Sequence, residues 1–319
     1  MSDVVAFVWG PAGVDRAAGG LLGAGQRLAE TLGGKLRAAV VGAADDAVVA
    51  AIQKQADTLL VLEDDLPGDY HPENYLAALV AVCKKLSPRA VLLGNDSASQ
   101  ELAPRLAHRL GGSAAGDAVD VAVVDGRLQV KRGVYGGKAT AVIALERSPG
   151  VVWVRARAMT PAEERAPGEV ERIRLGLTPD ARVRVVSRNI EAKGGSRLED
   201  ARLIVSGGRG LGGPEPFKQL QALADTIGAQ MAASRAACDA GWVPPSWQVG
   251  QTGKKVAPEL YLAIAISGAS QHIMGIADSK VICAINRDPD APIFKHCRFG
   301  LVEDYQKVVG PLVAKLKRP

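Results

Sequence analysis

The sequence predicts an α/β protein with two doubly wound domains. The N-terminal domain is expected to carry an antiparallel β addition, and the C-terminal domain to be built on a parallel sheet. Two observations predict this class. Short apolar runs of strand length alternate with amphipathic helical stretches near both ends of the chain, whereas the middle has strand-like runs with little helix between them. A length of 319 residues is enough for two domains, each with its own core.

The first part of the chain alternates strand and helix. Apolar runs of strand length lie at Val4–Trp9, Leu36–Val41, 58–63 and 90–94. The helical stretch after the first run places leucines on one side, at Leu21, Leu22, Leu28 and Leu32. Later helices are expected over 45–54, 73–86 and 99–110. Unbroken apolar strands between amphipathic helices indicate a parallel sheet covered on both faces.

The pattern changes after Gly116. Strand-like runs at 119–124 and 128–130 flank Asp125-Gly126, a dipeptide typical of a hairpin turn. Further runs of this kind follow at 141–145, 151–157 and 170–175. We expect this whole stretch to form the antiparallel addition, because it has little helix.

A polar, glycine-rich segment separates the two predicted domains. The sequence EAKGGSRLED covers residues 191–200, and its composition is that of a linker. We therefore place an N-terminal domain at 1–190 and a C-terminal domain at 191–319.

The last third alternates strand and helix again. Strands are expected at 201–206, 261–266 and 281–285. A helix over 214–227 carries Phe217, Leu220, Leu223 and Ile227 on one face. A closing helix at Tyr305–Leu316 directs Val308, Val309, Leu312 and Leu316 toward the core. This order predicts a second doubly wound unit.

Composition argues against several classes of function. Aromatic residues make up 4% of the chain and the net charge is +5, so no basic, aromatic platform for nucleic acid is visible. The four cysteines stand far apart, so no metal site is expected. The first residues show no export or transit signal, and no apolar run approaches the ~18 residues that span a bilayer. These features predict a cytoplasmic protein without membrane insertion.

A glycine-rich segment follows the strand at 201–206. Gly208, Gly210 and Gly213 satisfy G-x-G-x-x-G, and Pro214 stands near the start of the predicted helix. Such a loop can bring backbone N–H groups and a helix N-terminus toward a pyrophosphate, and Arg209 adds a planar cation. The alternative is a glycine-rich strand-to-helix turn without a ligand, since the acidic ribose ligand expected ~20 residues later is not clear.

Four further segments are candidates, each with a structural alternative. Ser234 and Arg235 suit an anionic ligand, or form a helix N-cap with a surface arginine. The loop with Gln248, Val249, Gly250, Gln251 and Thr252 can direct donors at a flat polar ring, or is an irregular connection. The turn with Ser267, Gly268, Ala269, Ser270, Gln271 and His272 opens a helix, and its histidine can bind a ligand or make a structural hydrogen bond. Asn286 ends another buried strand and Asp304 precedes the last helix, where each also suits a turn or a cap.

All these segments follow predicted strands of one sheet. Because the carboxyl ends of parallel strands meet at one edge, a dinucleotide-sized ligand is expected at the switch point of the second domain.

The runs VGQTGKKVAPELY, ISGASQH and AINRDPDAPIF, together with Gly207–Leu211 and 234–241, resemble electron transfer flavoprotein alpha subunits of the bacterial type. The resemblance is close over 203–316 and looser over 1–190. It departs at His296-Cys297-Arg298, where family members often have Val-Ala-Asp, and at Ser270, where a larger aliphatic residue is frequent.

The resemblance implies a heterodimer with a beta subunit that carries AMP, docked on the N-terminal domain, and FAD bound by the C-terminal domain. It assigns FAD contacts to the candidate residues of the four segments, together with Gly208, Arg209, Gly210 and Tyr305. Arg235, Thr252 and His272 are expected to tune the flavin, and no residue is expected to catalyse a bond change.

The resemblance further implies a carrier of fatty acid oxidation. Such a carrier takes electrons from acyl-CoA dehydrogenases and similar flavoprotein donors and passes them to a membrane quinone oxidoreductase. Three alternatives stay open: an NAD-linked flavin enzyme, an electron-bifurcating member of the same family, and a non-redox binder of adenine nucleotides.

Overall fold

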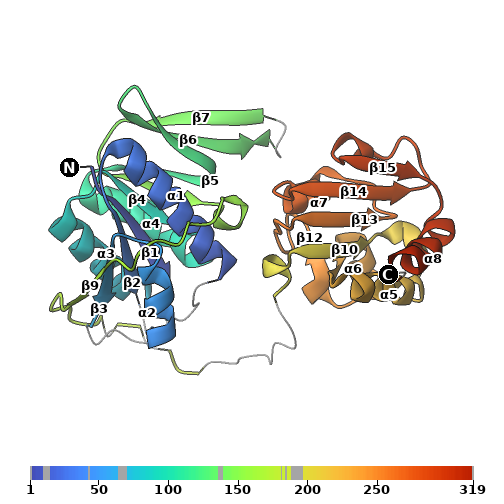
Figure 1. The fold of residues 1–319 in the computed structure, drawn as a ribbon, viewed down its shortest axis with the longest axis horizontal. Helices are drawn as coiled ribbons and strands as arrows, with labels where there is room; N and C mark the ends of the chain where they lie inside the picture. The colour runs from blue at the N-terminus through green and yellow to red at the C-terminus, as the bar shows by residue number, and fades with distance from the viewer. Residues whose placement is uncertain are drawn as a thin grey trace. The chain divides into compact units, whose positions relative to one another are not determined.

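The computed structural model describes residues 2–9, 15–41, 44–63, 70–135, 139–180, 182–183, 185–187 and 197–317. The chain divides into two compact units, Met1–Ile190 and Glu191–Pro319 (Figure 1). The polar segment in which we placed the domain boundary lies largely outside the described residues, which resume at Arg197.

Nine strands of the first unit, counted over its described residues, form one sheet in the order β7-β6-β5-β8-β4-β1-β2-β3-β9. Their bounds are β1 Val4–Trp9, β2 Leu36–Val41, β3 Thr58–Leu62, β4 Ala90–Leu93, β5 Ser113–Val124, β6 Arg127–Val134, β7 Ala139–Leu145, β8 Gly150–Val154 and β9 Glu169–Ile173. The helices are α1 Arg16–Leu32, α2 Asp46–Gln53, α3 Pro72–Leu86 and α4 Ser97–Leu110. They cover both faces, since α1 and α2 pack into one core and α3 and α4 into the other.

The predicted addition is partly antiparallel and partly not. β5 and β6 pair antiparallel around Asp125 and Gly126, whose φ angles of 51° and 74° are those of a type I′ turn. β6 also pairs antiparallel with β7. The prediction was wrong for the last two strands: β8 lies parallel between β4 and β5, and β9 lies parallel to β3 at the sheet edge. β8 is an unbroken apolar run that is buried on both faces, because Val152 and Val154 pack into one core and Val151 into the other.

The second unit, as far as it is described, has a six-stranded sheet in the order β12-β11-β10-β13-β14-β15, and all its pairings are parallel. Its strands are β10 Leu203–Gly207, β11 Gln230–Ser234, β12 Gln248–Val249, β13 Leu260–Ile264, β14 Val281–Asn286 and β15 Phe299–Val302. The helices are α5 Pro216–Ile227, α6 Arg235–Asp239, α7 Ser270–Ile276 and α8 Tyr305–Leu316. α5, α6 and α8 pack on one face of the sheet and α7 on the other.

Strand order reverses between β10 and β13, because the chain first builds outward through β11 and β12 and then returns to β13, β14 and β15. This is the switch point at which ligands of α/β sheets bind. No helix within the described ranges is long and apolar enough to cross a membrane.

Candidate functional site

The carboxyl edge of the second sheet brings the predicted segments to one end of the domain. Gly208 follows β10, Ser234 ends β11, Ser267 lies beyond β13 and Asn286 ends β14. The predicted residues differ in exposure. Those exposed at this edge are Arg209, Gly210, Arg235, Gln251, Thr252, Ser267, Ala269, Ser270 and Gln271. Ser234, Gln248, Asn286 and Asp304 are half-buried, and Gly208, Val249, Gly250, Gly268, His272 and Tyr305 are buried.

The glycine-rich segment differs from the expected phosphate loop. A 3₁₀ turn over Arg209–Leu211 follows β10, and α5 begins only at Pro216, two residues later than predicted. The N–H of Gly208 donates to Ile264 O at 2.9 Å, and that of Gly210 donates to Ala265 O at 3.2 Å. The backbone donors of these two glycines are therefore already used within the sheet.

Close packing explains why glycine is needed at position 208. A Cβ atom there would lie 2.1 Å from the carbonyl oxygen of Ala265. Ala265 itself adopts a left-handed φ of 54°, which ends β13 two residues before the predicted end and turns its backbone against the turn after β10. Gly208 thus lets two strand ends approach each other at the switch point, and Arg209, the charged residue of this segment, is exposed and can reach a ligand.

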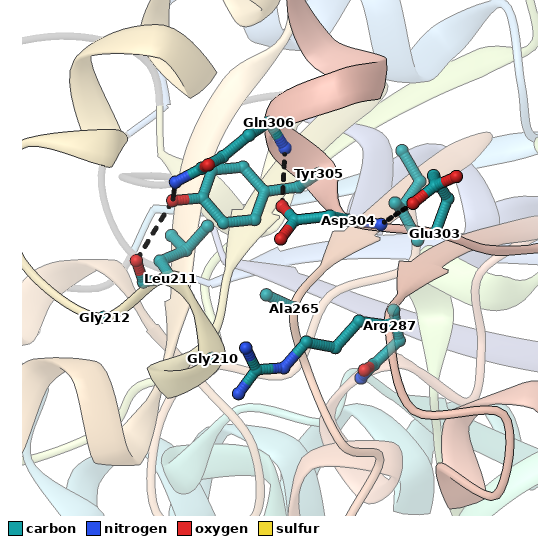
Figure 2. Close-up of a pocket in the computed structure, with 11 residues that line it drawn as sticks. Gly210, Leu211, Gly212, Ala265, Arg287, Glu303, Asp304, Tyr305 and Gln306 are labelled. Carbon is teal, nitrogen blue, oxygen red and sulfur yellow. Dashed lines mark hydrogen bonds between the residues drawn. The ribbon is translucent and has the colours of Figure 1, made fainter.

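A cavity of about 230 Å³ opens beside this turn (Figure 2). It is lined by Gly210, Leu211, Gly212, Ala265, Ile285, Asn286, Arg287, Glu303, Asp304, Tyr305 and Gln306. Four of these residues were predicted site residues, contributed by the 3₁₀ turn after β10, by β14 and by the start of α8. The sequence prediction missed Arg287, whose exposed side chain extends across the cavity toward Gly210 in Figure 2. Its position directly after Asn286 at a strand end was the available signal.

The predicted residues in this cavity also hold the fold together. Asn286 Nδ2 donates to Ile266 O at 2.9 Å, and Asn286 Oδ1 accepts from Asp288 N at 3.0 Å. Asp304 caps α8 by accepting from Gln306 N at 2.9 Å. The Tyr305 hydroxyl donates to Leu211 O at 3.1 Å. The turn and capping alternatives are therefore present, and the cavity lies directly beside them.

Ser234 and Arg235 begin α6. Ser234 occupies the N-cap position without a capping side-chain bond, and its Oγ is buried with no hydrogen-bond partner among the described residues. Arg235 pairs with Asp239 at 3.1 Å, and both side chains are more than half exposed. An exposed pair of this kind contributes little to stability, so Arg235 can exchange Asp239 for an anionic ligand at low cost.

The loop after β12 is fastened to α7. Gly250 has a φ of 148°, and the next residue, Gln251, donates its N–H to Gln271 O at 2.7 Å. Gln248 Nε2 donates to Thr252 Oγ1 at 3.0 Å. The Thr252 hydroxyl therefore accepts one bond inside the protein and keeps its own proton for an outside acceptor.

His272 is buried, with 7% of the residue exposed. Its Nε2 lies 3.0 Å from the Tyr261 hydroxyl oxygen. Burial lowers the pKa of His272 to about 4, and the nearby Val249 backbone offsets this only in part. The imidazole is therefore neutral at pH 7, and the structural hydrogen bond left open by the sequence is present.

The arrangement can bind an extended polar ligand along the sheet edge. Arg209, Arg235 and Arg287 supply positive charge, Thr252 supplies a hydroxyl donor, and the cavity beside Tyr305 can take one end of the ligand. Among the described residues of this edge, His272 is neutral and Asp304 is a helix cap, so neither forms a ready acid–base pair.

Comparisons with known proteins cover both units. Residues 3–177 match the model of the electron transfer flavoprotein domain, and residues 197–277 match that of the electron transfer flavoprotein FAD-binding domain. The alpha subunit of electron transfer flavoprotein from Thermoanaerobacterium thermosaccharolyticum is 37% identical over 304 residues, which cover 93% of this chain and 92% of that protein. The corresponding subunit of Paracoccus denitrificans is 38% identical over 278 residues, with 87% of each chain covered. That of Bacillus subtilis is 38% identical over 267 residues, covering 82% of this chain and 81% of the relative.

Proposed function

Since this chain belongs to the electron transfer flavoprotein family, as its FAD-binding alpha subunit, we propose that it carries electrons from acyl-CoA dehydrogenases and related flavoproteins to a membrane quinone oxidoreductase. Membership of the family implies a beta subunit as partner. The electron donors, the acceptor and the residues that hold FAD are the parts that we propose.

The residues at the carboxyl edge of the second sheet fit FAD. The buried Ser234 Oγ lacks a hydrogen-bond partner among the described residues, which is unfavourable unless a ligand supplies one. Arg209 is exposed, so its guanidinium can meet the pyrophosphate. The cavity beside Asn286, Asp304 and Tyr305 would hold the AMP end. When bound, FAD supplies a group that takes up and releases electrons singly.

The remaining predicted contacts are assigned to the flavin end. Gln248, Val249, Gly250, Gln251 and Thr252 would lie beside the ring, with the free proton of the Thr252 hydroxyl directed at a ring acceptor. Arg235 would place positive charge at the ring, and the turn Ser267, Gly268, Ala269, Ser270, Gln271 and His272 would line the ribityl chain. These residues bind, orient and polarise, and none has to move a proton.

The observation that carries the proposed carrier function is the state of the histidine at this positively charged edge. This residue, His272, is buried with a pKa of about 4 and is bonded to Tyr261. A substrate-converting enzyme would need a general base with a pKa near the working pH and access to a substrate. His272 has neither property, which supports electron transfer over an NAD-linked flavin reaction.

The first unit supports the proposed docking of the beta subunit. One face of β5, β6 and β7 packs over the core beneath α1, through Val121, Val130 and Ile143. The opposite face exposes Val124 at 42% and Val142 at 56%. The two valines stand on the strands that flank β6, four register positions apart, so they mark two separate points at which a docked beta subunit could cover this face.

The proposal is tested by producing the chain together with its beta subunit, counting flavins per heterodimer and measuring reduction by an acyl-CoA dehydrogenase. One FAD, reduction by the dehydrogenase and reoxidation by a quinone oxidoreductase are expected. Two flavins per heterodimer would instead indicate the bifurcating type. Val142→Lys should weaken assembly, whereas Lys84→Ala, an exposed position at the end of α3, should not.

A further inference from the structure

A half-buried ion pair joins the entry of the second unit to the loop that carries Thr252. Lys254 Nζ lies 3.2 Å from Glu199 Oε2, and the two side chains are 31% and 27% exposed. The Arg235–Asp239 pair of the same unit is much more open, with side chains 67% and 60% exposed. A pair withdrawn from water is screened less than a surface pair, so it holds its two partners together more firmly.

The carboxylate of Glu199 depends on this lysine. Its Oε2 atom is buried and has no hydrogen bond of normal geometry among the described residues, so the nearby Lys254 ammonium offsets its charge. A buried carboxylate oxygen without a neighbouring positive charge is strongly unfavourable. The ammonium is therefore kept beside Glu199.

Lys254 also closes the loop. Its N–H donates to Gln248 O at 2.8 Å, and its carbonyl oxygen accepts from Gly250 N at 3.1 Å. Residues 249–253 thus form a short closed turn between Gln248 and Lys254. Thr252 lies inside this turn, and its Oγ1 accepts from Gln248 Nε2 at 3.0 Å. A displacement of Lys254 is therefore passed on to Thr252, which stands two residues before it.

Glu199 itself is firmly placed. It lies in a 3₁₀ turn between Leu198 and Ala201, which are each 5% exposed. Both flanking residues pack into the same core as Val249 and Val256, which stand on either side of the loop tip. The turn and the loop therefore share one core, and the ion pair connects two segments that already lie side by side.

We propose that Glu199 is a positioning residue, which holds Lys254 and through it keeps the Thr252 hydroxyl in one place. This inference rests on the proposed function, in which that hydroxyl donates to the flavin ring. Glu199 also stands close in sequence to Ile190, the last residue of the first unit. The chain that joins the two units therefore leads directly to a residue that sets the surroundings of the flavin.

The first test is hydrogen exchange on the heterodimer. Glu199→Gln keeps the size of the side chain and removes its charge. Mass spectrometry of the peptide that spans the loop should show amide exchange roughly 3- to 5-fold faster than in the wild type, the change expected from the loss of one ion pair. Exchange equal to that of the wild type would overturn the proposal.

Glu259→Gln is the matched control for this measurement. It makes the same change of residue in the same unit, where Glu259 pairs with Arg202 at 2.9 Å and the side chains are 39% and 77% exposed. The exchange of the loop should not change in this variant. Equal acceleration in both variants would show a general loss of stability and would overturn the positioning role.

The second test separates positioning from charge, by a reductive titration with FAD bound. Removal of the negative charge of Glu199 would by itself raise the potential for the first electron, whereas misplacement of the Thr252 donor lowers it. We expect Glu199→Gln to lower the potential by less than Thr252→Ala does, and to cause no further lowering in a Thr252→Ala protein. A raised potential in the single variant, or an equal lowering in the Thr252→Ala background, would contradict the proposal.

The inference and the proposed function can fail separately, because the exchange measurement needs no electron transfer. Faster exchange in Glu199→Gln, together with a wild-type heterodimer that no dehydrogenase reduces, would refute the function and leave the structural tie intact. Normal reduction of the wild type, together with unchanged exchange in Glu199→Gln, would refute the positioning role alone.

Discussion

Gly208→Ala is expected to destabilise the C-terminal unit through contact between two strand ends. The added Cβ atom would lie 2.1 Å from Ala265 O, 2.7 Å from Ala265 C and 2.8 Å from Ile266 Cα. All three atoms belong to the backbone, so no flexible side chain can move aside. Relief requires β10 and β13 to separate at their carboxyl ends, where Gly208 N donates to Ile264 O.

The size of the destabilisation by Gly208→Ala follows from the cost of overpacking. Extra volume in a packed interior costs about 1–3 kcal/mol, and a contact with backbone belongs at the upper part of that range. The unit Glu191–Pro319 should unfold with an entropy of roughly 270 cal/mol/K, taking about 2.1 cal/mol/K per residue. A loss of about 2–3 kcal/mol then lowers the melting temperature of this unit by roughly 7–11 °C.

Gly213→Ala is the matched control, because it lies in the same G-x-G-x-x-G pattern. A Cβ atom at position 213 meets nothing within 4 Å, and its φ is outside the left-handed range. Differential scanning calorimetry of the heterodimer compares the two variants with the wild type. Equal melting temperatures for Gly208→Ala and the wild type would refute the packing argument, as would equal losses in both variants.

Three further outcomes are expected. Arg209→Ala should weaken FAD binding about 10- to 100-fold, because it removes a charge-assisted hydrogen bond of about 1.5–3 kcal/mol, and Arg209→Lys should weaken FAD binding less. Equilibrium dialysis measures both affinities, and a wild-type affinity in Arg209→Ala would remove this residue from the site. Arg235→Ala should lower the reduction potential for the first electron by roughly 65–130 mV, with a value near the lower end because the side chain is 67% exposed. A reductive titration measures this potential, and the control Lys218→Ala, at an exposed position on α5, should leave the potential unchanged. The alpha chain purified without its beta subunit should lose FAD during gel filtration, and a monodisperse, FAD-replete monomer would contradict this expectation.

Much of the fold follows from local pattern. The first strand, Val4–Trp9, and the last helix, Tyr305–Leu316, have the predicted bounds, because each pattern ends at a clear change of polarity or at an N-cap such as Asp304. The pairing of β8 did not follow from its sequence. Gly150–Val154 is an apolar run that suits either a parallel or an antiparallel neighbour, and only the return of the chain from β7 places it between β4 and β5.

The grouping of the candidate residues at one edge could be predicted from the sequence, but their hydrogen bonding could not. Because the predicted strands are parallel, their carboxyl ends lie at one edge of the sheet, so Gly208, Ser234 and Asn286 could be grouped from the sequence. The use of each hydrogen-bonding group could not be foreseen. The phosphate-loop interpretation assumed free N–H groups at Gly208 and Gly210, whereas the first donates to Ile264 O and the second to Ala265 O, at the left-handed turn that follows β13. A positive φ at an alanine has no sequence signal.

The distribution of used and unused hydrogen-bonding groups divides the predicted site into two parts. Asn286 and Asp304 use side-chain groups to hold the strand end and the helix start, so their substitution should change stability and binding together. Arg209 and Thr252 keep free donors, so their substitution should change binding with little effect on stability. The hydrogen bonds of Asn286 and Asp304, the frame of this edge, are therefore formed without the cofactor. Binding then costs little reorganisation, because the frame residues need not move and only a few exposed side chains become ordered.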